Sequence, residues 1–366
     1  MASWLAHAFA PYVWLLQLSR ATLGLCLGVY SFSIFTYTVE ITHPKYRSIS
    51  CGFIDCLRQT GMLFIYAVGS SRLHWRSVAL VCAFSSTIVP FCLFLFLPDS
   101  PRWLALHNRN KEAKKALVFY RGKNFDTDSE LNHITIQLQE TKGSDSALTQ
   151  FKMIINDKSI LKRVLIIILI LSISQFTGNI IIVSYTTIVF QSLPTSLNEY
   201  HSSIMIAVIR VIAVFCYTVS SAKLGRKKLA VIPVFICGIM LISTGSISYL
   251  SKQGYDLENI GWLPLIMMVV FVFFVCFNVS VLNIYRNELL PNSVRPVAGA
   301  CISPIALVSF VVLYFFPTVK NLIGIHGLFW AFGINCICMS ILSYFLLPET
   351  KGKSLEEIDD FFRGRR

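Results

Sequence analysis

Charged residues are scarce in this chain, and their scarcity limits the class of protein. Asp, Glu, Lys and Arg make up 14% of the 366 residues, whereas soluble domains carry about 25%. Hydrophobic residues make up 55%, and the mean hydropathy is +0.63. This balance argues against a soluble domain with an aqueous surface and indicates a chain surrounded by lipid.

Acidic residues are scarcer than basic ones, at 19 Asp and Glu against 32 Lys and Arg, which gives a net charge of +13. A basic chain can bind nucleic acid when its charges form one surface. Here the basic residues fall in loops between apolar runs, so we expect no nucleic-acid partner. The sequence says nothing about oligomeric state.

The signatures of catalysis and metal binding are also missing. The chain has no Gly-rich phosphate loop, no nucleophile–base spacing and no metal-ligand spacing, so we expect no enzyme, no ATP-driven motor and no cofactor. The 11 cysteines stand mostly singly in apolar segments, as small hydrophobic side chains rather than a disulfide framework. Residues 1–19 lack a basic start and a clear cleavage site, so no cleavable signal peptide is expected.

Long apolar runs are what the chain has in quantity. A run of about 20 apolar residues crosses a bilayer as a helix. Nine such spans are predicted, and residues 1–12 resemble the end of a tenth. The nine are 14–39, 50–69, 77–97, 162–190, 201–222, 229–250, 261–286, 297–318 and 326–347.

Alternate loops are basic, which orients the spans because cytoplasmic loops are enriched in Lys and Arg. The basic set includes the long polar segment 98–161 and the tail 348–366, so both are predicted to be cytoplasmic. Within the long segment, residues 110–120 indicate an amphipathic helix closed by Arg121 and Gly122. Residues 131–140 and 148–155 are candidates for further short helices.

Two short phrases recur at nearly the same offset. Glu40 and Arg47, seven residues apart, return 248 residues later as Glu288 and Arg295. The phrase LPDS at 97–100 returns 250 residues later as LPET. A repeat of this period inside apolar segments indicates two related membrane halves, as in many transporters. The first half is the shorter one, and we expect it to lack spans at its start.

Several motifs, in order along nearly the whole chain, carry a resemblance to a known family. They are Tyr37-Thr-Val-Glu40, Pro98-Asp-Ser-Pro-Arg-Trp103, Gln175-Phe-Thr-Gly178 with Tyr185, Leu224-Gly-Arg-Lys227, Gly261-Trp-Leu-Pro264, Glu288-Leu-Leu-Pro291 and Pro348-Glu-Thr-Lys-Gly-Lys-Ser354. The chain resembles the sugar porters of the major facilitator superfamily, and among them the insect facilitated trehalose transporters.

The resemblance implies an all-α membrane protein with the major facilitator fold, in which about 9 of 12 transmembrane helices are present. Residues 1–97 would be a partial N-terminal bundle (the end of span 3 and spans 4–6) and 162–347 a C-terminal six-helix bundle (spans 7–12). Segment 98–161 would be a cytoplasmic helical loop, and 348–366 a cytoplasmic tail.

The function implied is facilitated movement of a sugar, trehalose or a hexose, by alternating access. The partners would be a small-molecule sugar and the lipid bilayer, and the location that of a multi-pass protein of the plasma membrane. Two alternatives stay open: an organic ion transporter of the same superfamily, which Arg210 and Asp55 favour, and a non-transporting, truncated or degenerate relative.

A set of loop charges is predicted to gate the carrier. A cytoplasmic Glu–Arg network can tie two bundles together in one access state, and its loss lets them rock. By resemblance the network and its signature motifs comprise Glu40, Arg47, Arg102, Arg226, Glu288, Arg295 and Glu349. The alternative is that these residues only orient the loops. The family's Asp before the Gly-Arg-Lys motif is Ala222 here, so one arm of the network is missing.

Polar side chains within the spans are the candidates for binding solute. Amide and hydroxyl groups suit sugar hydroxyls, and at bilayer depth they are costly unless they face a cavity or one another. Gln175, Thr177, Asn179 and Tyr185 form this set by resemblance. The alternative is that they only tie span seven to its neighbours. The family's Gly-Pro-x-Pro-Trp stretch is replaced by 279–283, in which Asn283 carries an amide side chain.

Asp55 and Arg210 are unusual charges within predicted spans. One hypothesis places both in the cavity, where they would shift preference toward a different solute. The other holds that Asp55 pairs with Arg58, three residues along the same helix, in a sequence under relaxed constraint.

Overall fold

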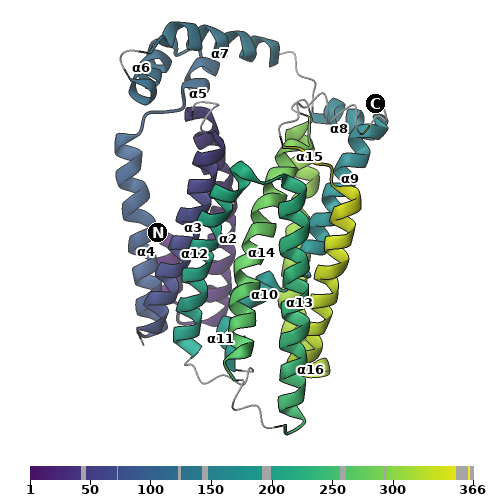
Figure 1. The fold of residues 1–366 in the computed structure, drawn as a ribbon. Coiled ribbons are helices and arrows are strands. Elements are labelled where there is room, and N and C mark those ends of the chain that lie inside the picture. The colour runs from purple at the N-terminus through teal and green to yellow at the C-terminus, as the bar shows by residue number, and fades with distance from the viewer. Residues whose placement is uncertain are drawn as a thin grey trace. The chain divides into compact units, whose positions relative to one another are not determined.

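The computed structural model describes residues 1–42, 47–71, 73–122, 125–141, 147–191, 199–255, 261–291, 294–351 and 362. In these ranges all regular secondary structure is α-helical, as the all-α prediction requires (Figure 1). The chain divides into two compact units, Met1–Ser144 and Asp145–Arg366. Of the predicted tail, residues 352–361 and 363–366 lie outside the described residues.

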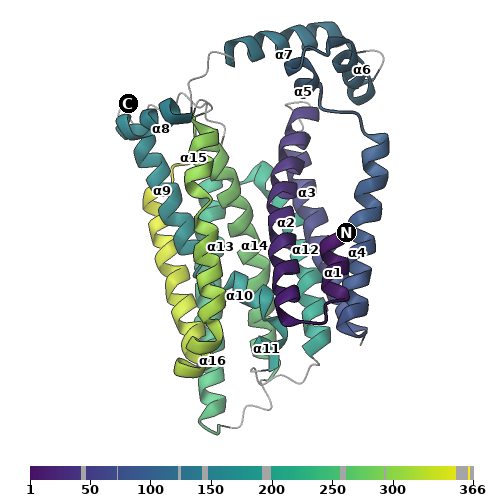
Figure 2. The same cartoon turned by 180° about the vertical axis from the view of Figure 1, so that it is seen from behind.

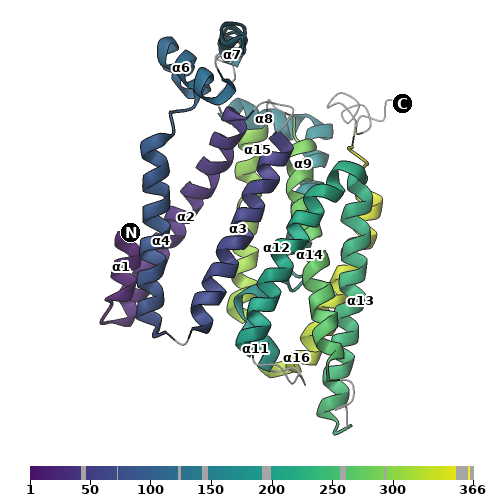
Figure 3. The same cartoon turned by 60° about the vertical axis from the view of Figure 1, so that its left-hand side comes forward.

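The first unit contains seven helices among its described residues. They are α1 (Ala2–Ala8), α2 (Val13–Ile41), α3 (Arg47–Ser70), α4 (Trp75–Phe96), α5 (Pro101–Leu106), α6 (Asn110–Arg121) and α7 (Thr127–Thr141). Of these, α2 and α4 include stretches long and apolar enough to cross a membrane. Helix α1 packs against α2 and α4, and Figure 3 shows α2, α3 and α4 as extended rods.

Helices α5, α6 and α7 form a small layer with its own core, in which Leu104, Ala105, Ala113 and Ala116 are buried. The predicted amphipathic helix is α6, and Gly122 ends it with a positive φ of 89°. Such a C-terminal glycine is common because only glycine adopts this conformation without strain. The helix expected over 131–140 is α7, which starts four residues earlier.

The second unit contains nine helices among its described residues. They are α8 (Ala147–Asn156), α9 (Lys158–Ser174), α10 (Asn179–Ser184), α11 (Thr186–Gln191), α12 (Glu199–Lys223), α13 (Arg226–Lys252), α14 (Leu263–Glu288), α15 (Arg295–Ile302) and α16 (Ile305–Leu346). Helix α13 packs along α14 and α16, α12 packs on α14, and α9 packs on α16 (Figure 2).

Six stretches among the described residues are long and apolar enough to cross a membrane. They lie at 13–30, 75–92, 202–221, 226–252, 263–288 and 297–346. The predicted span 50–69 coincides with α3, which is 24 residues long but carries Asp55 and Arg58. The predicted spans 297–318 and 326–347 fall in one run, bent at Gly324 (φ 73°). The count of nine spans therefore stays a prediction.

Candidate functional site

The apolar run 162–190, expected as one span, is interrupted in the second unit. Helix α9 ends at Ser174, and α10 begins at Asn179 after the left-handed residue Gly178 (φ 83°). A further break at Tyr185 separates α10 from α11. At membrane depth, unwound backbone is tolerated only where protein groups or a cavity satisfy it. Interrupted helices of this kind carry the binding sites of many transporters.

Helix α16 supplies the groups that satisfy the interruption. The amide Nδ2 of Asn335 donates to the carbonyl oxygen of Ile173 at 3.1 Å, near the end of α9, where that oxygen also accepts from the Phe176 N–H at 3.0 Å. The thiol of Cys336 lies 3.8 Å from the carbonyl oxygen of Thr177. The ring of Phe332 occupies the space beside Gly178, 3.0 Å from where a Cβ would lie. Side chains of α16 thus bond to or pack against the interrupted segment and stabilise it.

Gln175, the first predicted substrate ligand, follows the last residue of α9, and its side chain is half-buried. Its Oε1 accepts a 2.6 Å hydrogen bond from the hydroxyl of Ser309 on α16. Its Nε2 donates to the carbonyl oxygen of Leu171 at 3.0 Å and, more distantly, to Ser174 Oγ at 3.4 Å. The sequence did not single out Ser309, because isolated serines are common in membrane helices and this one belongs to no family motif.

Two further predicted ligands at the interruption bond to the protein itself. The hydroxyl of Thr177 is buried and donates to the carbonyl oxygen of Ser174 at 2.8 Å. The side-chain oxygen of Asn179 accepts from the Arg210 guanidinium of α12 at 3.0 Å. Arg210 is only 5% exposed and Asn179 is half-buried, so this bond is partly shielded within the second unit. The structure therefore joins two residues that the sequence suggested separately.

The other predicted ligands are distributed more widely. The ring of Tyr185 stacks on Phe316 of α16, with centroids 4.7 Å apart. Asn283 lies on α14 with its side chain exposed. Asp55 belongs to the first unit, where its carboxylate accepts from Arg58 at 3.1 Å on the same helix. That pair is the one expected from their spacing of three residues.

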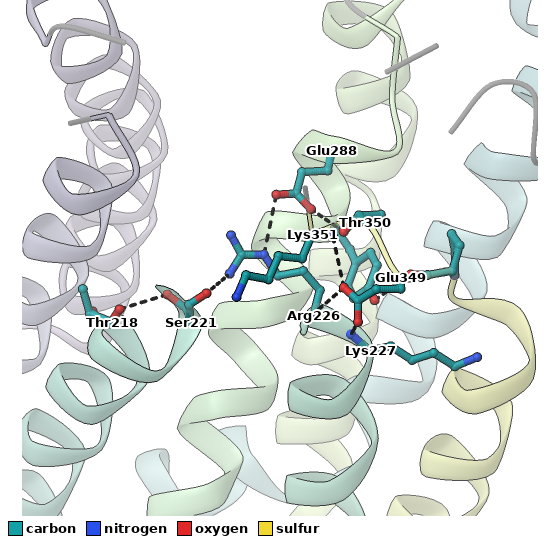
Figure 4. Close-up of polar contacts among 10 residues, drawn as sticks. Thr218, Ser221, Arg226, Lys227, Glu288, Glu349, Thr350 and Lys351 are labelled. Carbon is teal, nitrogen blue, oxygen red and sulfur yellow. Dashed lines mark hydrogen bonds and ion pairs between the residues drawn. The ribbon is translucent and has the colours of Figure 1, made fainter. Parts of the chain in front are cut away.

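A second polar cluster surrounds the start of α13 (Figure 4). The carboxylate of Glu349 accepts from the backbone N–H groups of Arg226 and Lys227 at 2.8 and 3.1 Å. These N–H groups have no partner within the helix, so the carboxylate caps its positive end. Gly225 leaves the room, because a Cβ there would collide with the carboxylate.

The environment of Glu349 favours its charged form. Partial burial alone would raise the pKa of the carboxyl group. The backbone N–H groups of Lys351, Arg226, Lys227 and Thr350 outweigh that effect and hold the pKa below its ordinary value of 4.5. Glu349 therefore stays ionised at neutral pH.

Arg226 extends the cluster to α14. Its Nε lies 3.7 Å from Glu288 Oε1, and its Nη1 donates to the carbonyl oxygen of Ser221 at 2.9 Å. The other oxygen of Glu288 accepts from the Thr350 hydroxyl at 2.5 Å. Figure 4 shows these groups converging from α12, α13, α14 and the segment after α16. Three predicted gating residues, Arg226, Glu288 and Glu349, thus lie together.

The other predicted gating residues are placed within their own units. Arg295, at the start of α15, donates to the carbonyl oxygen of Leu290 at 3.0 Å. In the first unit, Glu40 lies one residue before the end of α2 and Arg102 is exposed on α5. Arg47 begins α3, and its side chain lies outside the described residues.

A tyrosine contact repeats in both units, and it was not predicted. The hydroxyl of Tyr37 donates to the carbonyl oxygen of Pro98 at 2.8 Å. The hydroxyl of Tyr285 donates to the carbonyl oxygen of Pro348 at 2.9 Å. Each tyrosine stands three residues before the repeated glutamate, so the signal was present in the repeat itself.

Among the described residues, no group of three or more His, Cys, Asp or Glu side chains is placed to hold a metal ion. The polar groups of both clusters are amides, hydroxyls and paired charges, and the helices around them are apolar. This combination is that of an integral membrane protein whose apolar helices carry polar side chains at a few positions.

Solved structures identify the fold. The inward-open structure of the xylose transporter XylE from E. coli superposes with a TM-score of 0.75 at 21% identity, covering 98% of this chain and 79% of that one. XylE, described as a major facilitator superfamily proton:xylose symporter, also matches in its complex with 6-bromo-6-deoxy-D-glucose, with a TM-score of 0.73 at 20% identity, covering 98% of this chain and 80% of that one. The chain has the major facilitator fold.

The family follows from the sequence. The family model described as "Sugar (and other) transporter" matches residues 1–362, so the chain belongs to that family. It is 33% identical over 99% of its length to the facilitated trehalose transporter Tret1 of Anopheles gambiae, and 31% identical over all of it to Tret1 of Polypedilum vanderplanki. The chain spans 46% of the first relative and 72% of the second. The resemblance to sugar porters and to insect trehalose transporters is confirmed.

Proposed function

We propose that this protein is a facilitative sugar carrier of the plasma membrane that moves trehalose or a hexose by alternating access. Nine spans would be distributed over residues 1–97 and 162–347, which would form the two helical bundles. Residues 98–161 would be the cytoplasmic layer and 348–366 the cytoplasmic tail. Relatives about 30% identical are named as trehalose transporters, which supports the substrate class.

The observation that carries the proposal is the interruption of span seven at residues 175–178. There an amide and a hydroxyl, from Gln175 and Ser309, meet at 2.6 Å in a half-buried position. Such neutral polar groups suit a solute whose surface is hydroxyl groups, because each hydroxyl both donates and accepts. A site for a metal or a phosphate would need a different set of groups.

The charged cluster at the start of α13 supports a carrier with more than one state. Arg226 and Glu288 are joined by one ion pair of 3.7 Å, and both are partly exposed. A pair of this kind contributes about 1 kcal/mol or less, so modest differential contacts can break it. We assign to it, with Glu40, Arg47, Arg102, Arg295 and Glu349, the control of access from the cytoplasm.

Uptake into proteoliposomes tests the proposal. The purified chain is expected to carry labelled trehalose or glucose down a gradient until the two sides equalise, whether or not a protonophore is present. Gln175→Ala should reduce uptake about tenfold, the effect of losing one or two buried hydrogen bonds. Gln253→Ala, a matched change at the end of α13, should leave uptake unchanged.

Two results would contradict the proposal. One is a folded wild-type chain that carries none of the sugars offered. The other is accumulation against the gradient that the protonophore abolishes, which would make the carrier a coupled one.

A further inference from the structure

The donors of the Gln175–Ser309 pair can be assigned atom by atom. A carbonyl oxygen only accepts, so the group of Gln175 that faces Leu171 O at 3.0 Å must be the NH₂. The Oε1 of Gln175 therefore faces Ser309, and because Oε1 also only accepts, the Ser309 hydroxyl must donate. The orientation of the amide is thus fixed by its neighbours.

The donor hydrogens of this pair are all directed at protein atoms. The two amide hydrogens of Gln175 point to Leu171 O and to Ser174 Oγ. Ser174 cannot reverse that bond, because its own hydroxyl donates to Leu171 O at 2.7 Å. The hydrogen of Ser309 is held by Gln175 Oε1 at 2.6 Å. Acceptor capacity remains on two oxygens, Gln175 Oε1 and Ser309 Oγ.

From this pattern we propose that Ser309 is a specificity-determining residue, and that the Gln175–Ser309 pair accepts a hydrogen bond from a solute hydroxyl without donating one. The inference rests on the proposed function and adds to it which partner donates the hydrogen bond between the protein and the solute. A solute hydroxyl at this position acts as a donor. A group that only accepts cannot replace it, because its lone pairs would face those of the two oxygens.

Fluorinated sugars test whether the protein needs a hydrogen-bond donor on the solute or only a group of the size of a hydroxyl. Fluorine resembles a hydroxyl in size and accepts weakly, but it carries no hydrogen to donate. At the ring position that meets the pair, a monofluoro analogue should bind as poorly as the monodeoxy analogue, each at least about fivefold weaker than the parent sugar. A pair that donated would instead favour the fluoro analogue over the deoxy analogue.

The experiment measures competition against labelled trehalose or glucose by the monodeoxy and monofluoro analogues at each ring position. The variants are Ser309→Ala, which removes the hydroxyl, and Ser309→Thr, which keeps it. Ser303→Ala is the matched control, since its exposed hydroxyl donates only to the carbonyl oxygen of Gly299 in the same segment. Size-exclusion and thermal unfolding profiles establish that each variant is folded.

We expect the wild-type chain to reject both analogues at one common position. The Ser309→Ala variant keeps only the Gln175 acceptor, so its discrimination should weaken while its half-saturation concentration rises at least about fivefold. Ser309→Thr and Ser303→Ala should behave as the wild type. A purely structural role for Ser309 would lower thermal stability and leave the analogue pattern unchanged.

Each contrary result has its own meaning. If the wild type binds the parent sugar but accepts the fluoro analogue at every position, the pair donates, and the inference is wrong while the proposed function stands. If Ser309→Ala discriminates as the wild type does, Ser309 does not determine specificity. If the folded wild type binds none of the sugars, the proposed function fails and this inference fails with it.

Discussion

The hydroxyl of Tyr285 donates to the carbonyl oxygen of Pro348 at 2.9 Å and so joins the end of α14 to the segment after α16. Tyr37 makes the equivalent bond to Pro98 in the first unit, at 2.8 Å. The surroundings differ, because the Tyr120 hydroxyl lies 3.0 Å from Pro98 O and 2.5 Å from the Tyr37 hydroxyl, so two hydroxyl hydrogens are shared among three contacts. The two halves therefore share a contact, but in the first unit a second hydroxyl can take over the donation to proline.

That difference predicts unequal effects of removing one hydroxyl. Tyr285→Phe should destabilise the protein by about 1–3 kcal/mol, because it leaves the Pro348 carbonyl without this buried donor. Tyr37→Phe should cost less than about 1 kcal/mol, because Tyr120 lies 3.0 Å from Pro98 O and can donate to it once the Tyr37 hydroxyl is gone. Thermal unfolding in detergent measures both, with Tyr314→Phe, an exposed tyrosine on α16, as the control. Equal losses for the two variants would contradict this account.

The cap on α13 should be sensitive to acid. A carboxyl group whose pKa is lowered on folding stabilises the folded state above its unfolded pKa, and this contribution is lost as the pH falls through the folded pKa. For Glu349 that window begins near 4.5 and extends below it. Glu349→Gln should cost about 1 kcal/mol at neutral pH, and less as the pH falls through that window.

Hydrogen exchange at the start of α13, followed against pH, measures the effect. Glu112→Gln, which removes an exposed carboxylate from the surface pair with Arg109, is the matched control. Faster exchange in Glu349→Gln at neutral pH, converging with the wild type in acid, is the expected pattern. A constant difference at all pH values would show that the charge is not the cause.

Gly178 is required for both its backbone conformation and its lack of a side chain. Gly178→Ala should destabilise the protein by at least about 1–2 kcal/mol, because a left-handed alanine is strained and its Cβ would lie 3.0 Å from Phe332. Gly299→Ala on α15 meets nothing within 4 Å and should stabilise the helix by about 0.5–1 kcal/mol. Opposite signs in thermal unfolding are expected, and equal shifts would contradict the assignment.

Asn179 and Arg210 should be energetically coupled across α10 and α12. In a double-mutant cycle of Asn179→Ala and Arg210→Lys, we expect a coupling of about 0.5–3 kcal/mol, since the two side chains are directly bonded at 3.0 Å. Asp55→Asn and Arg58→Lys should couple by less than about 0.5 kcal/mol, because this pair lies within one helix at a spacing of three residues and Arg58 is 52% exposed. Chemical denaturation of the four single and two double variants provides the comparison.

Part of the second unit could be predicted from sequence. The motif around Gln175 indicated polar residues in span seven, but 162–190 was expected as one unbroken span, and the break at the left-handed Gly178 was not predicted. The repeat of Glu40 at Glu288, and of the phrase LPDS as LPET, located the ends of helices that carry the charged cluster. These signals are local in sequence, so no contact had to be known in advance.

Contacts between residues far apart in the sequence could not be predicted. Ser309 lies 134 residues from its partner Gln175, and Asn335 lies 162 residues from Ile173. Neither belongs to a motif, and a serine or asparagine in a membrane helix more often bonds to its own backbone or to a neighbour of no functional importance. The Arg226–Glu288 pair was expected only as part of a wider network, without its partner Thr350.

The shared carbonyl of Pro98 has a mechanical consequence for the first unit. Tyr37 of α2 lies within hydrogen-bond distance of Pro98 O and of the Tyr120 hydroxyl of α6, and Arg121 donates to the carbonyl oxygen of Ile41 at 2.7 Å. The layer of short helices is therefore attached to the end of α2 at two positions, Tyr37 and Ile41. A fluorophore attached to the exposed Lys115 of α6 would then report each tilt of α2.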